Sequence, residues 1–103
     1  MPFSRMLLVR QRFPDRRVAD IPGEVHRQLS AAAFAARLKP KSRVAIGVGS
    51  RGISNIATIV RAVVDFWKEQ GMRPTIFPAM GSHGAATAEG QARVLANYGI
   101  TEE

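Results

Sequence analysis

The chain has 103 residues, of which 46% are hydrophobic and 22% charged, and it contains no cysteine. This composition fits one small globular domain and excludes a disordered chain, a collagen-like fibre and a complete multi-domain enzyme. Without cysteine, disulfide scaffolds, thiolate metal sites and a cysteine nucleophile are also excluded, and a cytoplasmic location is expected. The apolar run Leu7 to Val9 near the N-terminus is too short for a signal peptide core or a membrane span, so no membrane partner is expected.

The net charge of +7 is concentrated in the first part of the sequence. Residues 1–43 hold ten basic against three acidic side chains, whereas residues 44–103 hold five of each. Nucleic-acid binding usually interleaves basic residues with aromatic ones or places them along a recognition helix, and neither pattern is present. A solvated or subunit-facing basic surface is therefore favoured, and nucleic-acid binding through residues 1–43 stays the weaker alternative.

The first elements in chain order are a strand and a helix. Residues 5–13 (RMLLVRQRF) predict a short strand that ends at a Pro-Asp turn. Residues 22–39 have apolar side chains near helical spacing and predict a surface helix that ends at Lys39-Pro40.

The remaining elements alternate strand and helix. The β-branched run Arg43 to Val48 predicts a buried, central strand, and residues 53–70 predict an amphipathic helix with Ser54 as its N-cap. A second strand is expected over residues 74–78 and a last helix over residues 87–98. Strand, helix, strand predicts parallel pairing by a right-handed crossover. We therefore expect a small α/β domain, Rossmann-like in two or three layers, with a mostly parallel sheet.

Both strands are followed by glycine-bearing loops, Gly49-Ser50-Arg51-Gly52 and Gly81-Ser82-His83-Gly84. Ligands of open α/β sheets bind beyond the carboxyl ends of the strands, so a site is expected where these loops meet. The side chains of Ser50, Arg51, Ser82 and Thr87, with the amides that open each helix, are candidates for an anion site, although helix capping is the favoured role of Thr87.

The first loop matches G-x-G-x-x-G over residues 47–52, a pattern typical of dinucleotide sites. The next strand ends in Phe77-Pro78 without the acidic residue that would hold a ribose, so this match is weak, and glycines needed only for the turn remain an alternative. Arg51 within the run suits a carboxylate or phosphate, because its planar guanidinium grips two oxygens.

His83 stands between small residues at a strand-to-helix junction, where a substrate can approach the ring. A histidine there can exchange a proton near neutral pH, but an exposed loop histidine without a task is equally compatible with the pattern. His26, within the predicted first helix, is assigned no role. Motifs of zinc hydrolases, P-loop NTPases and serine hydrolases are absent from the sequence, and no metal site is predicted in this chain.

A family resemblance is carried by two segments, residues 44–64 (VAIGVGSRGISNIATIVRAVV) and residues 78–103 (PAMGSHGAATAEGQARVLANYGITEE). They resemble the N-terminal domain of the nickel-dependent lactate racemase family, in its branch of nickel-pincer-nucleotide isomerases. The resemblance implies that Arg51 holds the carboxylate of a 2-hydroxy acid and that His83 is an acid/base that takes the hydroxyl proton. Ser50, Gly52 and Ser82 would then line the anion end of the site.

The resemblance also implies that this chain works with a further part. In the family the α-hydrogen leaves as hydride to a nickel pincer nucleotide, and the residues that hold the cofactor come from a later portion. We therefore expect one N-terminal domain over residues 1–103, a fragment of a longer chain, inactive alone and without a tightly bound cofactor. Lactate racemases proper carry Asp-Thr-Arg-Pro in the first loop, so the 2-hydroxy acid is left open. The alternative is a non-catalytic nucleotide- or anion-binding module, and either form is compatible with a homodimer.

Overall fold

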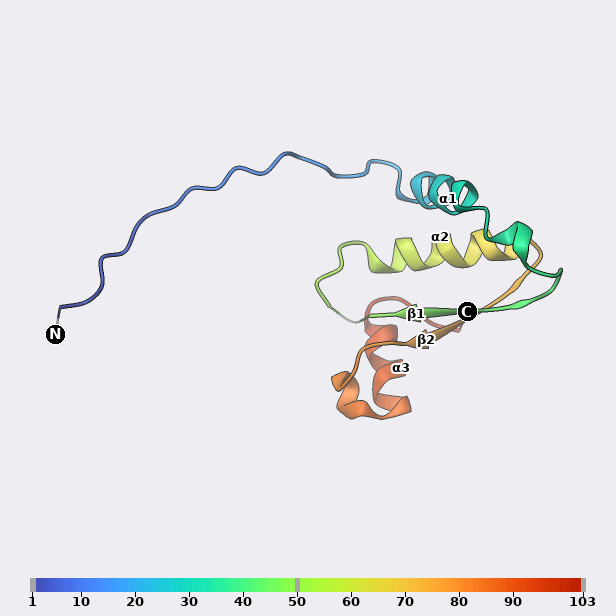
Figure 1. The fold of residues 1–103 in the computed structure, drawn as a ribbon. Coiled ribbons are helices and arrows are strands. Elements are labelled where there is room, and N and C mark those ends of the chain that lie inside the picture. The colour runs from blue at the N-terminus through green and yellow to red at the C-terminus, as the bar shows by residue number, and fades with distance from the viewer. Residues whose placement is uncertain (1, 50, 103) are drawn as a thin grey trace.

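The structure, a computed structural model, describes residues 2–49 and 51–102 and is mixed α/β. Its elements are α1 (Ile21–Ala32), η1 (Ala35–Arg37), β1 (Arg43–Val48), α2 (Ile56–Glu69), β2 (Arg73–Pro78), η2 (His83–Ala86) and α3 (Ala88–Asn97). β1 and β2 form a two-stranded parallel sheet, with α2 along it, α1 outside α2, and α3 beside β2 (Figure 1). Among the described residues, no helix combines the length and apolar character needed to cross a bilayer.

The parallel β1-α2-β2 unit forms as the sequence predicts. Residues 44, 46 and 48 of β1 turn toward the core while the residues between them are exposed, which is the two-residue period of a strand covered on one face. Two details of the prediction are wrong. Ser54 is not the N-cap of α2, since Asn55 occupies that position in a left-handed conformation with φ of 57°. β1 is not central, because β2 is its one neighbour among the residues described.

Two core clusters hold the helices to the sheet. The first joins β1, α2 and α3 and consists of Val48, Ile56, Val60, Met80, Leu95 and Ile100. The second lies where α1 and η1 meet the end of α2 and consists of Phe66, Trp67 and Met72, with Leu29 and Ala35 against it. α1 also meets α2 through the ring of His26, which lies edge-on to Phe66 and 3.5 Å from Glu69.

The first helix ends earlier than predicted. A helix over residues 22–39 is wrong beyond Ala32, because Ala33 adopts a φ of 55° and the chain continues into η1. In an unbroken helix Leu29 and Ala35 would lie about 120° apart around the axis. The break allows both of them to pack on the second core cluster, so burial of apolar area decides where the helix stops.

The predicted strand over residues 5–13 is absent. Residues 2–20, here called the N-terminal arm, contain neither helix nor strand and are exposed throughout. The arm extends away from the rest of the molecule (Figure 1). A strand needs a neighbour for its backbone hydrogen bonds, and the arm meets none here, so the β-forming composition of this segment has no structural effect.

The loop after β2 is held by a close backbone crossing. Gly84, with φ of 64°, passes the first turn of α3 so closely that a Cβ built on Gly90 would lie 1.9 Å from the Gly84 carbonyl oxygen. Thr87 caps α3, because its Oγ1 accepts a hydrogen bond from the N–H of Gly90 at 3.1 Å, as predicted. Ala85 and Ala86 also have positive φ, an unfavourable conformation that the crossing maintains.

We predict that Gly90→Ala destabilises the fold by about 2 kcal/mol, because the new methyl group must displace the Gly84 backbone. Glycine to alanine within an open helix would instead stabilise by up to about 1 kcal/mol. Urea denaturation measures the change. Gly81→Ala is the matched control, since Gly81 has positive φ but nothing within 4 Å of its added Cβ, and should cost only about 1 kcal/mol. A Gly90→Ala protein as stable as wild type would contradict the crossing.

The first turn of α1 carries an acid-sensitive contact. Hydrogen bonds from Arg27 and then from Gln28 lower the pKa of Glu24 from its ordinary 4.5 to about 2. Because the folded pKa is lowered, this stabilisation is present above the ordinary value and is lost as pH falls from there through about 2. We predict that thermal unfolding midpoints of wild type and Glu24→Gln differ at neutral pH and converge below about pH 2. A difference that is constant with pH would contradict this.

Candidate functional site

The carboxyl ends of the two strands lie side by side and bring the two glycine-bearing loops together. The ladder continues one step past β2, where the Ala79 N–H donates to the Val48 carbonyl at 2.8 Å. Beyond this bond the chain enters the first loop after Val48 and the second after Ala79. The expectation that both loops share one edge of the sheet is therefore confirmed for their described residues.

Arg51 and His83 are in direct contact, although 32 residues separate them in the sequence. The Nε of Arg51 lies 3.3 Å from the Nε2 of His83, and Nη2 of Arg51 lies 2.7 Å from the same ring nitrogen. Arg51 is exposed, and His83, at the first residue of η2, is half-buried. These are the two side chains for which the sequence predicted a direct role in chemistry.

The contact fixes the proton position on the imidazole ring. A guanidinium carries only donors, so Nε2 of His83 must accept, and the hydrogen of the neutral ring then lies on Nδ1. The lone pair on Nε2 is thus directed at the guanidinium of Arg51. A guanidinium has five N–H groups, so this contact leaves donors for a second acceptor.

The second loop is anchored by two hydrogen bonds to the residues just before His83. Met80 is buried in the first core cluster, and its carbonyl accepts a hydrogen bond from the His83 N–H at 3.3 Å. From α3, the Nε2 of Gln91 donates to the Gly81 carbonyl at 2.8 Å. Gln91 was not singled out from the sequence. Its signal is a position one helical turn after the capping Thr87, from which its side chain returns over the loop.

The other predicted site residues contribute less. Ser82 is exposed and makes no side-chain hydrogen bond as the cap of η2. Gly52 is an exposed residue of the first loop with φ of 77°, which favours glycine there. Ser50 lies outside the described residues. The anion site of Ser50, Arg51, Ser82 and Thr87 therefore stays a prediction, and the contact that the structure shows in this region is the one between Arg51 and His83.

Arg51 is exposed, His83 is half-buried, and the two hollows described below do not include either of them. A groove of about 370 Å³ runs between α2, β2 and residues 99–102, and its lining includes neither Arg51 nor His83. A second hollow, beside Gly84 and the first turns of α3, also omits them. Within residues 2–49 and 51–102, no group of three or more His, Asp or Glu side chains is placed to hold a metal ion.

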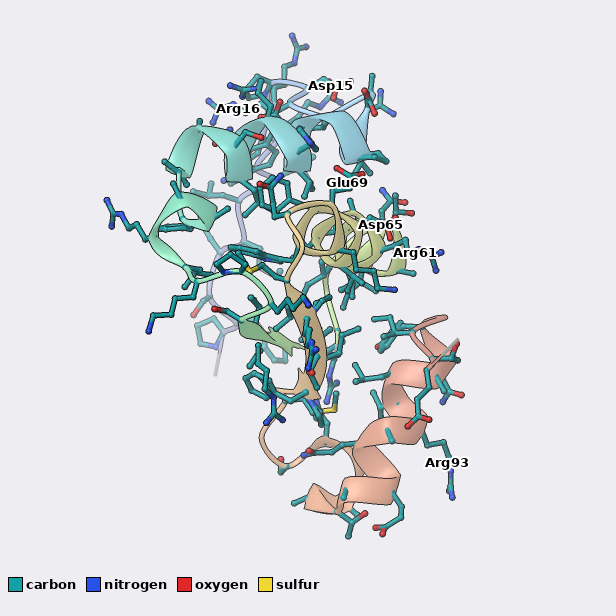
Figure 2. The ribbon with its side chains drawn as sticks, turned by 90° about the vertical axis from the view of Figure 1, so that its right-hand side faces the viewer. Asp15, Arg16, Arg61, Asp65, Glu69 and Arg93 are labelled. Carbon is teal, nitrogen blue, oxygen red and sulfur yellow. The ribbon has the colours of Figure 1, made fainter. Side chains whose placement is uncertain are left out.

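We predict that replacing Arg51 changes the tautomer of His83. In wild type, ¹⁵N NMR of the ring should find Nδ1 protonated and Nε2 acting as acceptor, because Arg51 donates to Nε2. Arg51→Leu should increase the population protonated at Nε2. The control is Arg93→Leu, since Arg93 projects from α3 away from the sheet (Figure 2). An unchanged ring spectrum in Arg51→Leu would contradict the contact.

Comparison of the chain with known protein families, with curated proteins and with solved structures finds no match.

Proposed function

We propose that this chain is the substrate-side domain of a nickel-pincer-nucleotide-dependent racemase or epimerase of 2-hydroxy acids. The observation that carries the proposal is the contact between Arg51 and His83 at the carboxyl edge of two parallel strands. The same edge hosts ligands in Rossmann-like domains, and we propose that fold for the complete sheet. The sequence resemblance assigns carboxylate binding and proton transfer to these same two residues.

The substrate carboxylate binds Arg51. Two parallel N–H groups of a guanidinium match the two oxygens of a carboxylate, and such charge-assisted pairs are the strongest hydrogen bonds available to an exposed side chain. Arg51 is exposed and reachable by a ligand. In this proposal, Ser50, Gly52 and Ser82 line the anion end of the site.

The position of His83 fits the second functional group of such a substrate. A 2-hydroxy acid carries its hydroxyl on the carbon next to the carboxylate. A carboxylate on Arg51 therefore brings the hydroxyl to the ring nitrogen that lies 2.7 Å from the guanidinium. As the carboxylate takes over the Arg51 donors, Nε2 of His83 exchanges its hydrogen bond from Arg51 for one from the hydroxyl, whose proton it then accepts.

The described residues do not fit a nickel site, since no cluster of ligating side chains is present among them. The chemistry that we assign to this chain is therefore confined to the carboxylate and the hydroxyl proton. The cofactor, which accepts the hydride in the family, would be held by another part of the enzyme. The open surface around Arg51 agrees with a site that a partner domain completes, so the chain alone should bind weakly and not turn over substrate.

A non-catalytic anion-binding module is the second candidate. It is favoured by the exposure of Arg51 and by the position of both loops at the same edge of the sheet. The two functions differ in one requirement. An anion module needs only the charge of the ligand, whereas the racemase domain also recognises the hydroxyl through His83.

Titration of the ¹⁵N-labelled chain with paired carboxylic acids tests the proposal. Lactate and 2-hydroxybutyrate, each compared with the acid that lacks the hydroxyl, should shift the Arg51 and His83 signals, with dissociation constants of the order of millimolar. Arg51→Leu should weaken binding of every acid by about tenfold or more. His83→Ala should remove the preference for the hydroxy acids and leave carboxylate binding in place.

The controls separate the two candidates. Arg61→Leu removes an exposed cation of α2 that pairs with Asp65 at 3.4 Å on the outer side of that helix (Figure 2), and it should leave binding unchanged. Equal binding of hydroxy and plain acids, together with tighter binding of inorganic phosphate or nucleotides, would favour the anion module. Absence of any shift at Arg51 and His83 would contradict both functions.

A further inference from the structure

The N-terminal arm exposes an unusual amount of apolar side chain. Met6, Leu7 and Leu8 are 94%, 88% and 103% exposed, and Phe3, Val9 and Phe13 are also largely exposed. Single exposed apolar residues are normal on a soluble protein, but a contiguous run of this kind marks a contact surface. The sequence of residues 5–13 also has the composition of a strand.

The size of the molecule shows that the arm lacks a packing partner. The accessible surface is 8753 Å², whereas a compact protein of 11.2 kDa exposes about 5,700 Å². The radius of gyration is 18.9 Å, against about 13 Å for a compact domain of this length. The arm that projects in Figure 1 accounts for this excess.

The two free edges of the sheet differ in their hydrogen-bonding capacity. Arg73 and Ala79 donate their N–H groups toward β1, so alternation along β2 turns residues 74, 76 and 78 to the outer edge. Two of these three, Pro74 and Pro78, have no N–H. Proline on the solvent side of an edge strand prevents further pairing, so the outer edge of β2 does not accept another strand.

The outer edge of β1 is able to pair. The same alternation turns residues 43, 45 and 47 outward, and each of them carries both an N–H and a carbonyl. The inward face of β1 presents Val44, Ile46 and Val48 to the core clusters. A strand added at this edge would extend that apolar face, and it needs alternate apolar side chains to do so.

We propose that residues 5–13 of a second copy of this chain pair with the outer edge of β1, so that two copies exchange their arms. Alternation places Leu7, Val9 and Phe13 on one side of the added strand, together with Arg5 and Gln11 toward its ends, and places Met6, Leu8, Arg10 and Arg12 on the other. The side with Leu7, Val9 and Phe13 continues the core face of β1, and Arg10 and Arg12 remain in solvent. The residues of this interaction are separate from Arg51 and His83, and the added strand occupies the edge of β1 at which the sheet can be extended.

The β1 edge of a second copy is a better partner for the arm than the β1 edge of the same chain. The arm runs away from its own β1, and reciprocal exchange closes as a two-fold dimer in which both β1 edges and both arms become paired.

The charge of the chain predicts how salt affects this dimer. Each copy has a net charge of +7, so the copies repel at low salt. Added salt screens this repulsion and should strengthen the dimer. A nucleic acid on the basic arm would show the opposite salt dependence.

Sedimentation analysis of the 103-residue chain measures the dimer. We expect a concentration-dependent dimer that added salt strengthens, and a dissociation constant about tenfold higher or more for Leu7→Asp combined with Val9→Asp. Val18→Asp, a charge in the arm outside the pairing segment, is the matched control and should dimerise as wild type does. A monomer throughout the micromolar range, or a dimer that the double substitution does not weaken, would overturn the proposal.

Disulfide trapping identifies which chain supplies the strand, because the natural sequence contains no cysteine. A mixture of Leu8→Cys chains and Ala45→Cys chains should give a linked heterodimer under oxidation, whereas Val18→Cys mixed with Ala45→Cys should not. The double variant Leu8→Cys/Ala45→Cys should link between chains. An intrachain link at every concentration would show that each arm folds onto its own sheet and would overturn the exchange.

Discussion

The hydrogen bond from the Ala79 N–H to the Val48 carbonyl, 2.8 Å long, is the last rung of the parallel ladder and the point from which both loops diverge. Because the strands are parallel, their carboxyl ends lie at the same edge of the sheet. α2 connects the strands and brings the chain from the end of β1 back to the start of β2. The contact between Arg51 and His83 depends on this register. A slip of one residue would turn the side chains of β1 to the opposite face and separate the loops from the core that anchors them.

The second loop is held by several contacts. Met80 enters the core, Gln91 binds the Gly81 carbonyl, and Gly84 crosses α3 at backbone contact distance. These constraints offset the cost of the positive φ of Ala85 and Ala86, about 1–2 kcal/mol per residue. His83 therefore sits at the start of a segment that these contacts hold in place.

Local patterns in the sequence were sufficient to predict part of this structure. The strands, α2, α3 and the shared edge of the two loops follow from apolar periodicity and from the geometry of a parallel crossover, so Arg51 and His83 could be assigned to one edge. The direct hydrogen bond between Arg51 and His83 could not be predicted, because it depends on side-chain conformations in two loops.

The errors arose where distant packing decides the conformation. The early end of α1 at Ala32 depends on the second core cluster, and the role of Gln91 depends on how the loop returns past α3. The unformed strand at residues 5–13 has the right composition but no neighbour within the chain. Propensity describes what a segment can form, and the available partner determines whether it does.

The prolines of β2 also determine on which side the sheet can grow, and therefore where the candidate site lies in it. Since Pro74 and Pro78 prevent growth of the sheet on their side, added strands can lie only beyond β1, and β2 stays at the margin. His83, which follows β2, then remains at the periphery, whereas Arg51 moves toward the interior as the sheet widens. In the function proposed above, a small anion would therefore approach from the β2 side, past the imidazole, and reach the guanidinium last.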